Sequence, residues 1–352
     1  MFSNISGTVM AFGVGAGNMV VNDPGAIVGP LSAIFGTILN FIFEFVHTFM
    51  HFNVLGVSII LLTIFTRIIM IPLAIKMQKS FAGMRLVGPE MQAIKKKYDS
   101  VTKTRESQQK MNAEIQALYA KHKINPFGGC LPLLVQMPIF ISLNFIMQQS
   151  YRYVGQIGDV FTQISEQIIG LYSIMGREAY MEFAERHFIP KIPNNMDLAN
   201  FNMGVPSDIE RIVSRFTPEE WYSFIADMPA QTQEYMYYLV SQKDALEVFF
   251  GINLSQGAGI GFPGIFIPIL AAVTTFLSSY YMMKLTASST MDEKQMQMQK
   301  MMLYMMPLMI GFFTVQMAAG VGLYWITSSA FQFVQQLLLN KYYTPPVPQA
   351  TK

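Results

Sequence analysis

A single arginine lies inside an otherwise uncharged, apolar stretch of this sequence. The 22 residues from Val54 to Ile75 carry one charge, that of Arg67. At the centre of a membrane such a charge costs roughly 2.5–3.5 kcal/mol on insertion scales, so it requires water, a polar partner or a cavity. Thr63 and Thr66 are close enough on a helix to form a polar patch with it. We expect Arg67 to be a cation held in a water-filled groove; the alternative is that its side chain reaches up to the lipid headgroups.

Other residue types that could perform chemistry are sparse. Because Cys130 is the only cysteine, an internal disulfide and a cysteine-based metal cluster are excluded. His47 and His51 have helical spacing, but no third ligand lies near them in the sequence, so we expect no metal site. The sequence contains no phosphate loop, dinucleotide fingerprint or nucleophile elbow. We therefore expect neither an enzyme nor a cofactor.

The composition is that of a protein that crosses a membrane several times. Of the 352 residues, 52% are hydrophobic and only 13% are charged, whereas a soluble domain carries about 25% charged residues. As a helix, the stretch around Arg67 would be about 33 Å long, enough to cross the roughly 30 Å hydrocarbon core of a bilayer. The expected fold class is all-α.

The apolar stretches predict a bundle of five membrane-spanning helices. The expected spans are residues 54–75, 131–149, 263–283, 301–318 and 321–340. The last two come from the uncharged run Met301–Leu339, which is too long for one helix and should break near Ala318–Gly322.

The segment 31–52 carries polar side chains at spacings of three and four residues, which places them on one helical face. They are Thr37, Asn40, Glu44, His47 and His51. This pattern predicts an amphipathic helix that lies in the membrane interface. The alternative is a sixth span with a polar seam.

The charge of the connecting segments predicts the topology. Residues 76–130 hold 11 Lys and Arg against four acids and should form a basic helical hairpin, which the positive-inside rule places in the cytoplasm. Residues 150–261 hold seven basic residues against 14 acids and should form an extracytoplasmic helical cap, with a capping box at Thr217–Glu220.

The remaining segments follow from these assignments. Residues 1–30 form a flexible extracytoplasmic tail, residues 284–300 a methionine-rich cytoplasmic loop, and residues 341–352 a cytoplasmic tail. The N-terminus is therefore expected outside and the C-terminus in the cytoplasm.

Three sequence blocks resemble the YidC/Oxa/Alb family of membrane protein insertases. They are GVSIILLTIFTRIIMIPL at 56–73, PEMQAIKKKYDS with NAEIQALYAKHKINPFGGCLPLLVQMPIF within 89–140, and GVGLYWITSSAFQFVQQ at 320–336. The resemblance covers roughly Ile27–Gln149 and Val248–Asn340. It is to bacterial members that lack a large periplasmic domain ahead of the first core span; this chain instead has an insertion at about 156–245.

The resemblance implies a five-helix bundle around a hydrophilic groove that is open to the cytoplasm and to lipid. Arg67 corresponds to the groove arginine of the family, and Gln136 and Trp325 fall where relatives place residues that face the groove or its client. In the third span, Thr274 and Ser278 would add to the polar lining, with Thr63 on the first. For Gln136 the alternative is a hydrogen bond that ties down a proline-kinked helix, and for Trp325 it is an aromatic belt at the interface.

As a member of this family, the protein would insert nascent membrane proteins into the bacterial plasma membrane and help them to fold, without a cofactor. The resemblance adds the Sec translocon, the signal recognition particle receptor and the ribosome as candidate partners. DNA is not expected as a partner. The groove would shorten the dry path for a client's polar tail, and the cation would attract its acidic residues. The competing hypotheses are a small-solute transporter or channel and a structural assembly scaffold.

Methionines are concentrated near the fourth span. Ten of the 28 lie in Met282–Met309. Because flexible thioether surfaces suit promiscuous apolar binding, we expect Met296 and Met298 to contact clients first. The alternative is ordinary packing against lipid and core.

Overall fold

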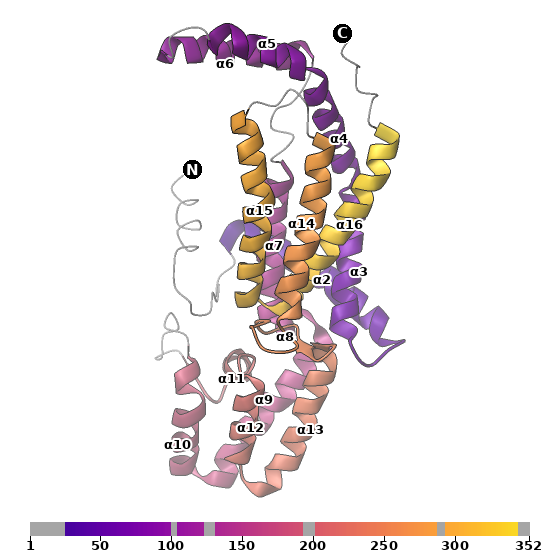
Figure 1. Cartoon of the computed structure of the whole chain (residues 1–352). Coiled ribbons are helices and arrows are strands. Elements are labelled where there is room, and N and C mark those ends of the chain that lie inside the picture. Colours follow the sequence, from indigo (N-terminus) through magenta and orange to yellow (C-terminus); the bar gives the residue numbers. More distant parts are fainter. Residues whose placement is uncertain (1–24, 100–103, 123–130, 193–200, 287–292, 344–352) are drawn as a thin grey trace.

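The structure is a computed structural model that describes residues 25–99, 104–122, 131–192, 201–286 and 293–343. These residues are almost entirely helical, and the expected all-α class is confirmed. Figure 1 shows an elongated molecule in which a bundle of long helices separates two smaller parts. One is the hairpin of α5 (Gly88–Asp99) and α6 (Arg105–Lys121), and the other is a compact helical domain at the opposite end.

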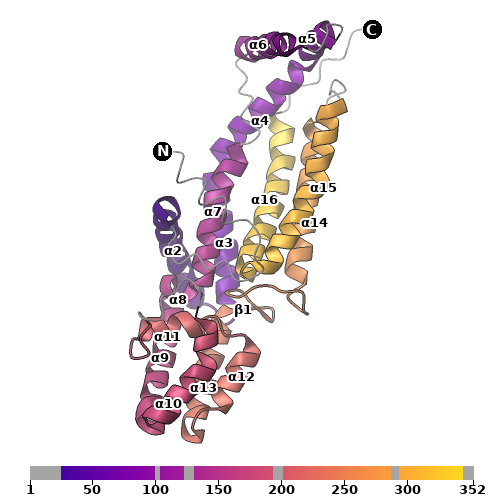
Figure 2. The ribbon, with the colours of Figure 1, turned by 90° about the vertical axis from the view of Figure 1, so that its left-hand side faces the viewer.

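The bundle is built from seven helices of the described chain. They are α2 (Gly25–His47), α3 (Val54–Ile69), α4 (Ile71–Leu86), α7 (Leu131–Gln148), α14 (Phe266–Thr286), α15 (Glu293–Gln316) and α16 (Ala319–Tyr343). Helix α14 packs against α15 and α16, while α3 packs against α16 and α2, and α2 packs against α7 (Figure 2). The chain between α15 and α16 breaks at Met317 and Ala318, at the edge of the small-residue cluster where the break is expected.

Two described helices are long and apolar enough to cross a membrane by themselves, Val28–His47 and Phe266–Lys284. A third span results if Val54–Ile69 and Ile71–Lys79 are taken together, although a bend of 50° separates them. The described parts of α7 and α15 include shorter apolar stretches, Val135–Gln148 and Leu303–Gln316. The protein is thus a helical membrane protein, and the count of five spans remains a prediction.

The expected continuous helix at 54–75 is divided in the structure. Helix α3 ends at Ile69, Met70 caps it, and α4 runs on to Leu86, well into the segment assigned to the hairpin. The physical cause is Pro72, which lacks the N–H that would continue α3 and whose fixed φ suits the first turn of a new helix.

Helix α2 is displaced towards the N-terminus relative to the expected segment 31–52, because it begins at Gly25 and ends at His47. Its polar side chains contact protein: Asn40 Oδ1 accepts a hydrogen bond from the Gly155 backbone N–H at 2.8 Å, and Glu44 Oε2 accepts one from Gln156 Nε2 at 2.8 Å. Phe41, on another face, is 73% exposed. The helix therefore has a face against the bundle, a polar face against the cap and an apolar face that suits lipid.

The compact helical domain, residues 150–247, is called the cap domain from here on. It contains α8 (Ser150–Tyr153), α9 (Gly155–Met175), α10 (Arg177–His187), the short 3-10 helix η2 (Ile189–Lys191), α11 (Pro206–Val213), α12 (Pro218–Ala226) and α13 (Ala230–Glu247). Its core is a cluster of buried aromatic rings that includes Phe183, Phe188, Phe216 and Phe224. The predicted capping box is confirmed, because Thr217 Oγ1 accepts from the Glu220 N–H and Glu220 Oε2 accepts from the Thr217 N–H.

The cap domain joins the bundle through the junction loop, residues 248–257. This loop contains a two-residue antiparallel pair, β1 (Val248–Phe249) and β2 (Ile252–Asn253). It also supplies the backbone carbonyls that accept hydrogen bonds from the first N–H groups of α16: Gln256 O accepts from Ala319 N at 2.7 Å, and Leu254 O accepts from Gly320 N at 2.8 Å. These are the donors that a helix start otherwise leaves unsatisfied, so the loop fixes where α16 begins.

Candidate functional site

Arg67 lies in the last turn of α3 and hydrogen-bonds two other helices of the bundle. Its Nε donates to Ser328 Oγ on α16 at 2.7 Å, and its Nη2 also contacts this hydroxyl. The same Nη2 donates to Gln136 Oε1 on α7 at 3.2 Å. The arginine therefore links α3, α7 and α16.

Gln136 is itself held in place from the other side. Its Nε2 donates to the hydroxyl of Tyr324 on α16 at 2.5 Å. With one end of the amide on Tyr324 and the other on Arg67, the side chain has a defined orientation in which its oxygen faces the cation.

Trp325 belongs to a second hydrogen-bonded group, which joins α16 to α14. Its indole Nε1 donates to Thr275 Oγ1 at 3.0 Å, and Thr275 lies 3.3 Å from the Ser329 hydroxyl. The indole ring makes an edge-to-face contact with Phe140 of α7, with ring centroids 5.0 Å apart. Trp325 thus connects α7, α14 and α16 one residue away from Tyr324.

No described hydrogen bond joins the other three predicted residues to Arg67. Thr63 is buried, and its hydroxyl donates to the Ile59 carbonyl of its own helix at 2.6 Å. The Thr274 hydroxyl likewise donates to the Leu270 carbonyl at 2.7 Å, while Ser278 is buried on α14. Threonine hydroxyls in helices often bond the carbonyl one turn back, which leaves less capacity for a ligand. Met296 and Met298 fall within α15, but their side chains lie outside what the structure describes.

Sequence reasoning missed the hydroxyl that contacts Arg67 most closely, that of Ser328. The available signal was helical spacing, because Ser328 follows Tyr324 by four residues and Ser329 follows Trp325 by four. Polar residues continue along α16 to Gln335, which is seven residues beyond Ser328 and so lies on the same face, about 10 Å further along the helix.

Two side-chain atoms on this part of α16 are buried without a hydrogen-bond partner in the described structure. They are Gln335 Nε2, a donor, and Gln336 Oε1, an acceptor; the Gln336 side chain belongs to a residue that is only 5% exposed. A buried unpaired amide group costs free energy, so water or a ligand is expected there.

The electrostatics of the cluster are unusual because the described partners of Arg67 are neutral. Its described hydrogen bonds come from Nε and Nη2 to an amide oxygen and a hydroxyl. A guanidinium has five N–H donors, so capacity remains for an acidic ligand. Among the described residues there is no cluster of His, Cys, Asp and Glu that could hold a metal ion.

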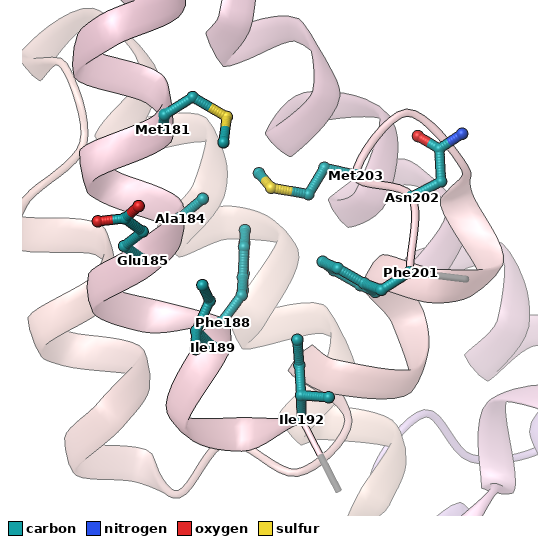
Figure 3. Close-up of a pocket in the computed structure, with 9 residues that line it drawn as sticks. All are labelled: Met181, Ala184, Glu185, Phe188, Ile189, Ile192, Phe201, Asn202 and Met203. Carbon is teal, nitrogen blue, oxygen red and sulfur yellow. The ribbon is translucent and has the colours of Figure 1, made fainter. Parts of the chain in front are cut away.

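A separate cavity of about 340 Å³ lies in the cap domain, remote in sequence from the Arg67 cluster (Figure 3). Its lining is mostly apolar and comes from α10, η2 and the start of the segment before α11: Met181, Ala184, Glu185, Phe188, Ile189, Ile192, Phe201, Asn202 and Met203. The chain between Ile192 and Phe201 lies outside the described residues.

Comparison with known proteins decides the family. The model of the family described as 60Kd inner membrane protein matches residues 45–198 and 220–346. The chain belongs to this family. The match includes Arg67, Gln136 and the whole of α16 up to Tyr343, so the polar cluster lies in the part shared with the 60Kd inner membrane protein family.

Curated relatives are similar over most of the chain. A protein of Oceanobacillus iheyensis named membrane protein insertase YidC is 27% identical over 81% of this chain and 74% of its own length. Membrane protein insertase YidC 1 of Lactococcus lactis is 30% identical over 82% of this chain and 69% of its own length. Membrane protein insertase MisCA of Bacillus subtilis is 27% identical over 81% of this chain and 70% of its own length.

Proposed function

We propose that this protein inserts other proteins into the bacterial membrane, and that Arg67 draws the acidic, polar part of each client into the helical bundle. Family membership and the names of the relatives support membrane protein insertion as the activity. The observation that carries the role of Arg67 is its set of neutral partners, Gln136 and Ser328, which orient the guanidinium without neutralising its charge.

The physical basis is the strength of charge interactions away from bulk water. Two unit charges 4 Å apart attract by about 1 kcal/mol in water and by about 4 kcal/mol at an effective dielectric constant of 20. A cation whose hydrogen bonds already fix its orientation loses little side-chain entropy when an anion binds. A client carboxylate would therefore be held strongly enough to enter but would leave once its apolar helix partitions into lipid.

The groove itself is part of the proposal. We propose that α3, α7, α14 and α16 surround a hydrophilic groove. This groove would reach from the hairpin end of the bundle to Arg67 and be open to lipid. The buried polar residues of α14 and α16 support it, in particular the unpaired amide atoms of Gln335 and Gln336 beyond Ser328. The proposal includes the topology. The chain would cross the membrane five times, with its N-terminus outside and its C-terminus and hairpin in the cytoplasm. In this proposal the protein is not an enzyme.

The hairpin and the methionines have proposed roles in the approach of a client. Lys96 lies near the end of α5 and is exposed, which suits contact with anionic headgroups, the ribosome or the signal recognition particle receptor. The Sec translocon is a further proposed partner. We propose that Met296 and Met298 make early apolar contacts, which crosslinking from either position to a stalled client would detect.

The experiment is insertion of a small client with an acidic translocated tail into liposomes. Wild type, Arg67→Ala, Arg67→Lys and empty vesicles are compared, with a second client whose tail acids are replaced by amides. We expect Arg67→Ala to lose most of the insertion of the acidic client and less of the insertion of the amide client. Arg67→Lys should retain part of the activity, because lysine keeps the positive charge but not the planar guanidinium that can form two parallel hydrogen bonds with a carboxylate.

Two outcomes would contradict the proposal. Equal insertion by wild type and Arg67→Ala would leave Arg67 with a purely structural role, as the scaffold hypothesis predicts. Failure of wild type to exceed empty vesicles would favour the transporter or scaffold hypotheses over insertion.

A further inference from the structure

A buried ion pair lies at the boundary between the cap domain and the bundle. Lys243 and Glu247 are one turn apart at the end of α13, with Nζ and Oε2 separated by 3.3 Å. Both side chains are only 3% exposed. Charges buried to this extent require a full set of partners, because an unpaired carboxylate in the interior is strongly destabilising.

The Glu247 carboxylate has such a set, and its partners come from three parts of the chain. Oε1 accepts from Ser150 Oγ at 2.7 Å and from Ser255 Oγ at 2.9 Å. Oε2 accepts from Lys243 Nζ at 3.3 Å and from Asn253 Nδ2 at 3.4 Å. A carboxylate offers about four acceptor sites, so Glu247 is fully used in joining α13, α8 and the junction loop.

The junction loop transmits this anchoring to α16. The backbone N–H of Leu254 donates to the Glu247 carbonyl at 3.1 Å, and the Leu254 carbonyl accepts from Gly320 N at 2.8 Å. Tyr324 and Ser328 follow Gly320 by one and two turns of the same helix. The position of α16, and with it the partners of Gln136 and Arg67, therefore depends on the loop that Glu247 holds.

The same loop also touches the start of α3, the helix that carries Arg67. The Phe250 N–H donates to Asn53 Oδ1 at 3.0 Å, and the Phe249 ring lies against Gly56 so closely that a Cβ there would be 2.1 Å from it. The junction loop thus fixes the starts of both helices, α3 and α16, whose later turns meet at Arg67 and Ser328. Figure 1 places α13 and the cap domain directly beneath these helix ends.

We propose that Glu247 is a positioning residue for the Arg67 cluster, and that the cap domain acts through it to set the relative register of α3 and α16. The effect on insertion rests on the proposed function, whereas the effect on helix register does not. The readout for the position of α16 is the fluorescence of Trp325, because its indole N–H binds Thr275 on α14 and its ring contacts Phe140 on α7.

The chain offers a clean fluorescent background, since Trp221 and Trp325 are its only two tryptophans. Trp221 lies in the cap domain, and its buried Nε1 has no hydrogen-bond partner in the described structure, so Trp221→Phe removes no described hydrogen bond. In this background the test variants are Glu247→Gln and the double variant Lys243→Met with Glu247→Met. The double variant guards against misfolding, because replacing both members of a buried ion pair by apolar residues is often neutral for stability.

The matched control is Asp227→Asn. It breaks an ion pair of the same domain, with Arg186 and His187 both at 3.0 Å, that has no described contact with the junction loop. We expect both Glu247 variants to shift the emission maximum and quenching of Trp325 and to lower liposome insertion by about tenfold, equivalent to roughly 1.4 kcal/mol. Asp227→Asn should leave both readouts at the wild-type level.

The outcomes separate the two proposals. A Trp325 shift in the Glu247 variants with no insertion by any protein would support positioning and contradict the proposed function. Wild-type emission and insertion in the folded double variant would overturn the positioning role. So would an equal Trp325 shift in Asp227→Asn, because the effect would then be a general response of the cap domain.

Discussion

The cap domain and the bundle differ in how their charged groups are partnered. In the described cap domain, the carboxylates of Asp227 and Glu247 are each paired with cations, and the aromatic core is closed around Phe188 and Phe224. In the bundle, Arg67 has neutral described partners, and Gln335 and Gln336 each bury an unpaired atom. These carboxylates of the cap domain are compensated within the chain, whereas the described bundle leaves hydrogen-bonding capacity at Arg67, Gln335 and Gln336.

Truncating the aromatic core of the cap domain should give the largest loss of stability. Phe224 is fully buried and contacts Phe183, Phe188 and Phe216, so Phe224→Ala should cost about 3–5 kcal/mol. Trp221 fluorescence during denaturant unfolding in detergent would measure it. The matched control is Tyr222→Ala on the same helix, where the side chain is 67% exposed and the change should stay within about 0.5 kcal/mol. Equal losses would contradict a rigid aromatic core.

A second test compares two helical glycines, one at the bundle and one in the cap domain. Gly56→Ala would force a Cβ into the Phe249 ring and should destabilise the protein by about 1–3 kcal/mol. Gly170→Ala on α9 meets no atom within 4 Å and should be neutral or stabilise by up to about 1 kcal/mol. Thermal unfolding of the two variants measures the difference, and a tolerated Gly56→Ala would show that the junction loop can move away from α3.

Removing a polar partner of Arg67 should affect activity more than stability. Ser328→Ala deletes the hydroxyl that accepts from Arg67 Nε, and we expect insertion of an acidic client to fall about fivefold, equivalent to roughly 1 kcal/mol. Thr327→Ala is the control on the same turn, because that hydroxyl donates to the Leu323 carbonyl at 2.9 Å within its own helix. The liposome assay and a melting curve are run in parallel. A similar loss of insertion in both variants would assign the effect to the helix and not to the cation.

The smallest expected effect is a pH dependence in the cap domain. The hydrogen bond from Arg186 and, as the next largest cause, the hydrogen bond from His187 lower the pKa of Asp227 below its usual value. The stability that this pair contributes is therefore present above the unfolded pKa of about 3.9 and is lost as the pH falls through the lower, folded pKa. Unfolding curves at pH 7 and pH 3 should lie closer together for Asp227→Asn than for wild type. No difference between the two proteins would mean that the pair contributes nothing to stability.

Features that depend on residues close together in the sequence could be predicted from it. A lone charge in a long apolar run identified Arg67, and the resemblance to the insertase family added Gln136 and Trp325. The structure joins Gln136 to Arg67 by a hydrogen bond, whereas the described hydrogen bond of Trp325 goes to Thr275 on α14. The capping box at Thr217 was also readable, since its members are three residues apart.

What could not be predicted depends on contacts between distant residues or on competition within a helix. Glu247 reads as an ordinary surface acid until Ser150 and Ser255, far away in sequence, are seen to enclose it. Thr63 reads as a partner for Arg67, but its own helix offers the Ile59 carbonyl at closer range. The bend at Met70 was also not predicted: the apolar composition continues through it, and Pro72, its local signal, was included in the expected continuous helix.

That bend has a mechanical consequence. Met70 lies three residues after Arg67, and α4 then continues for 16 residues towards the hairpin at an angle of 50° to α3. Such an arm is about 24 Å long, so a tilt of about 10° around the elbow moves its far end by about 4 Å while the pivot hardly moves. Helix α4 also packs against α14 and α16, so the bend and these contacts together set where the hairpin lies relative to Arg67 and Ser328.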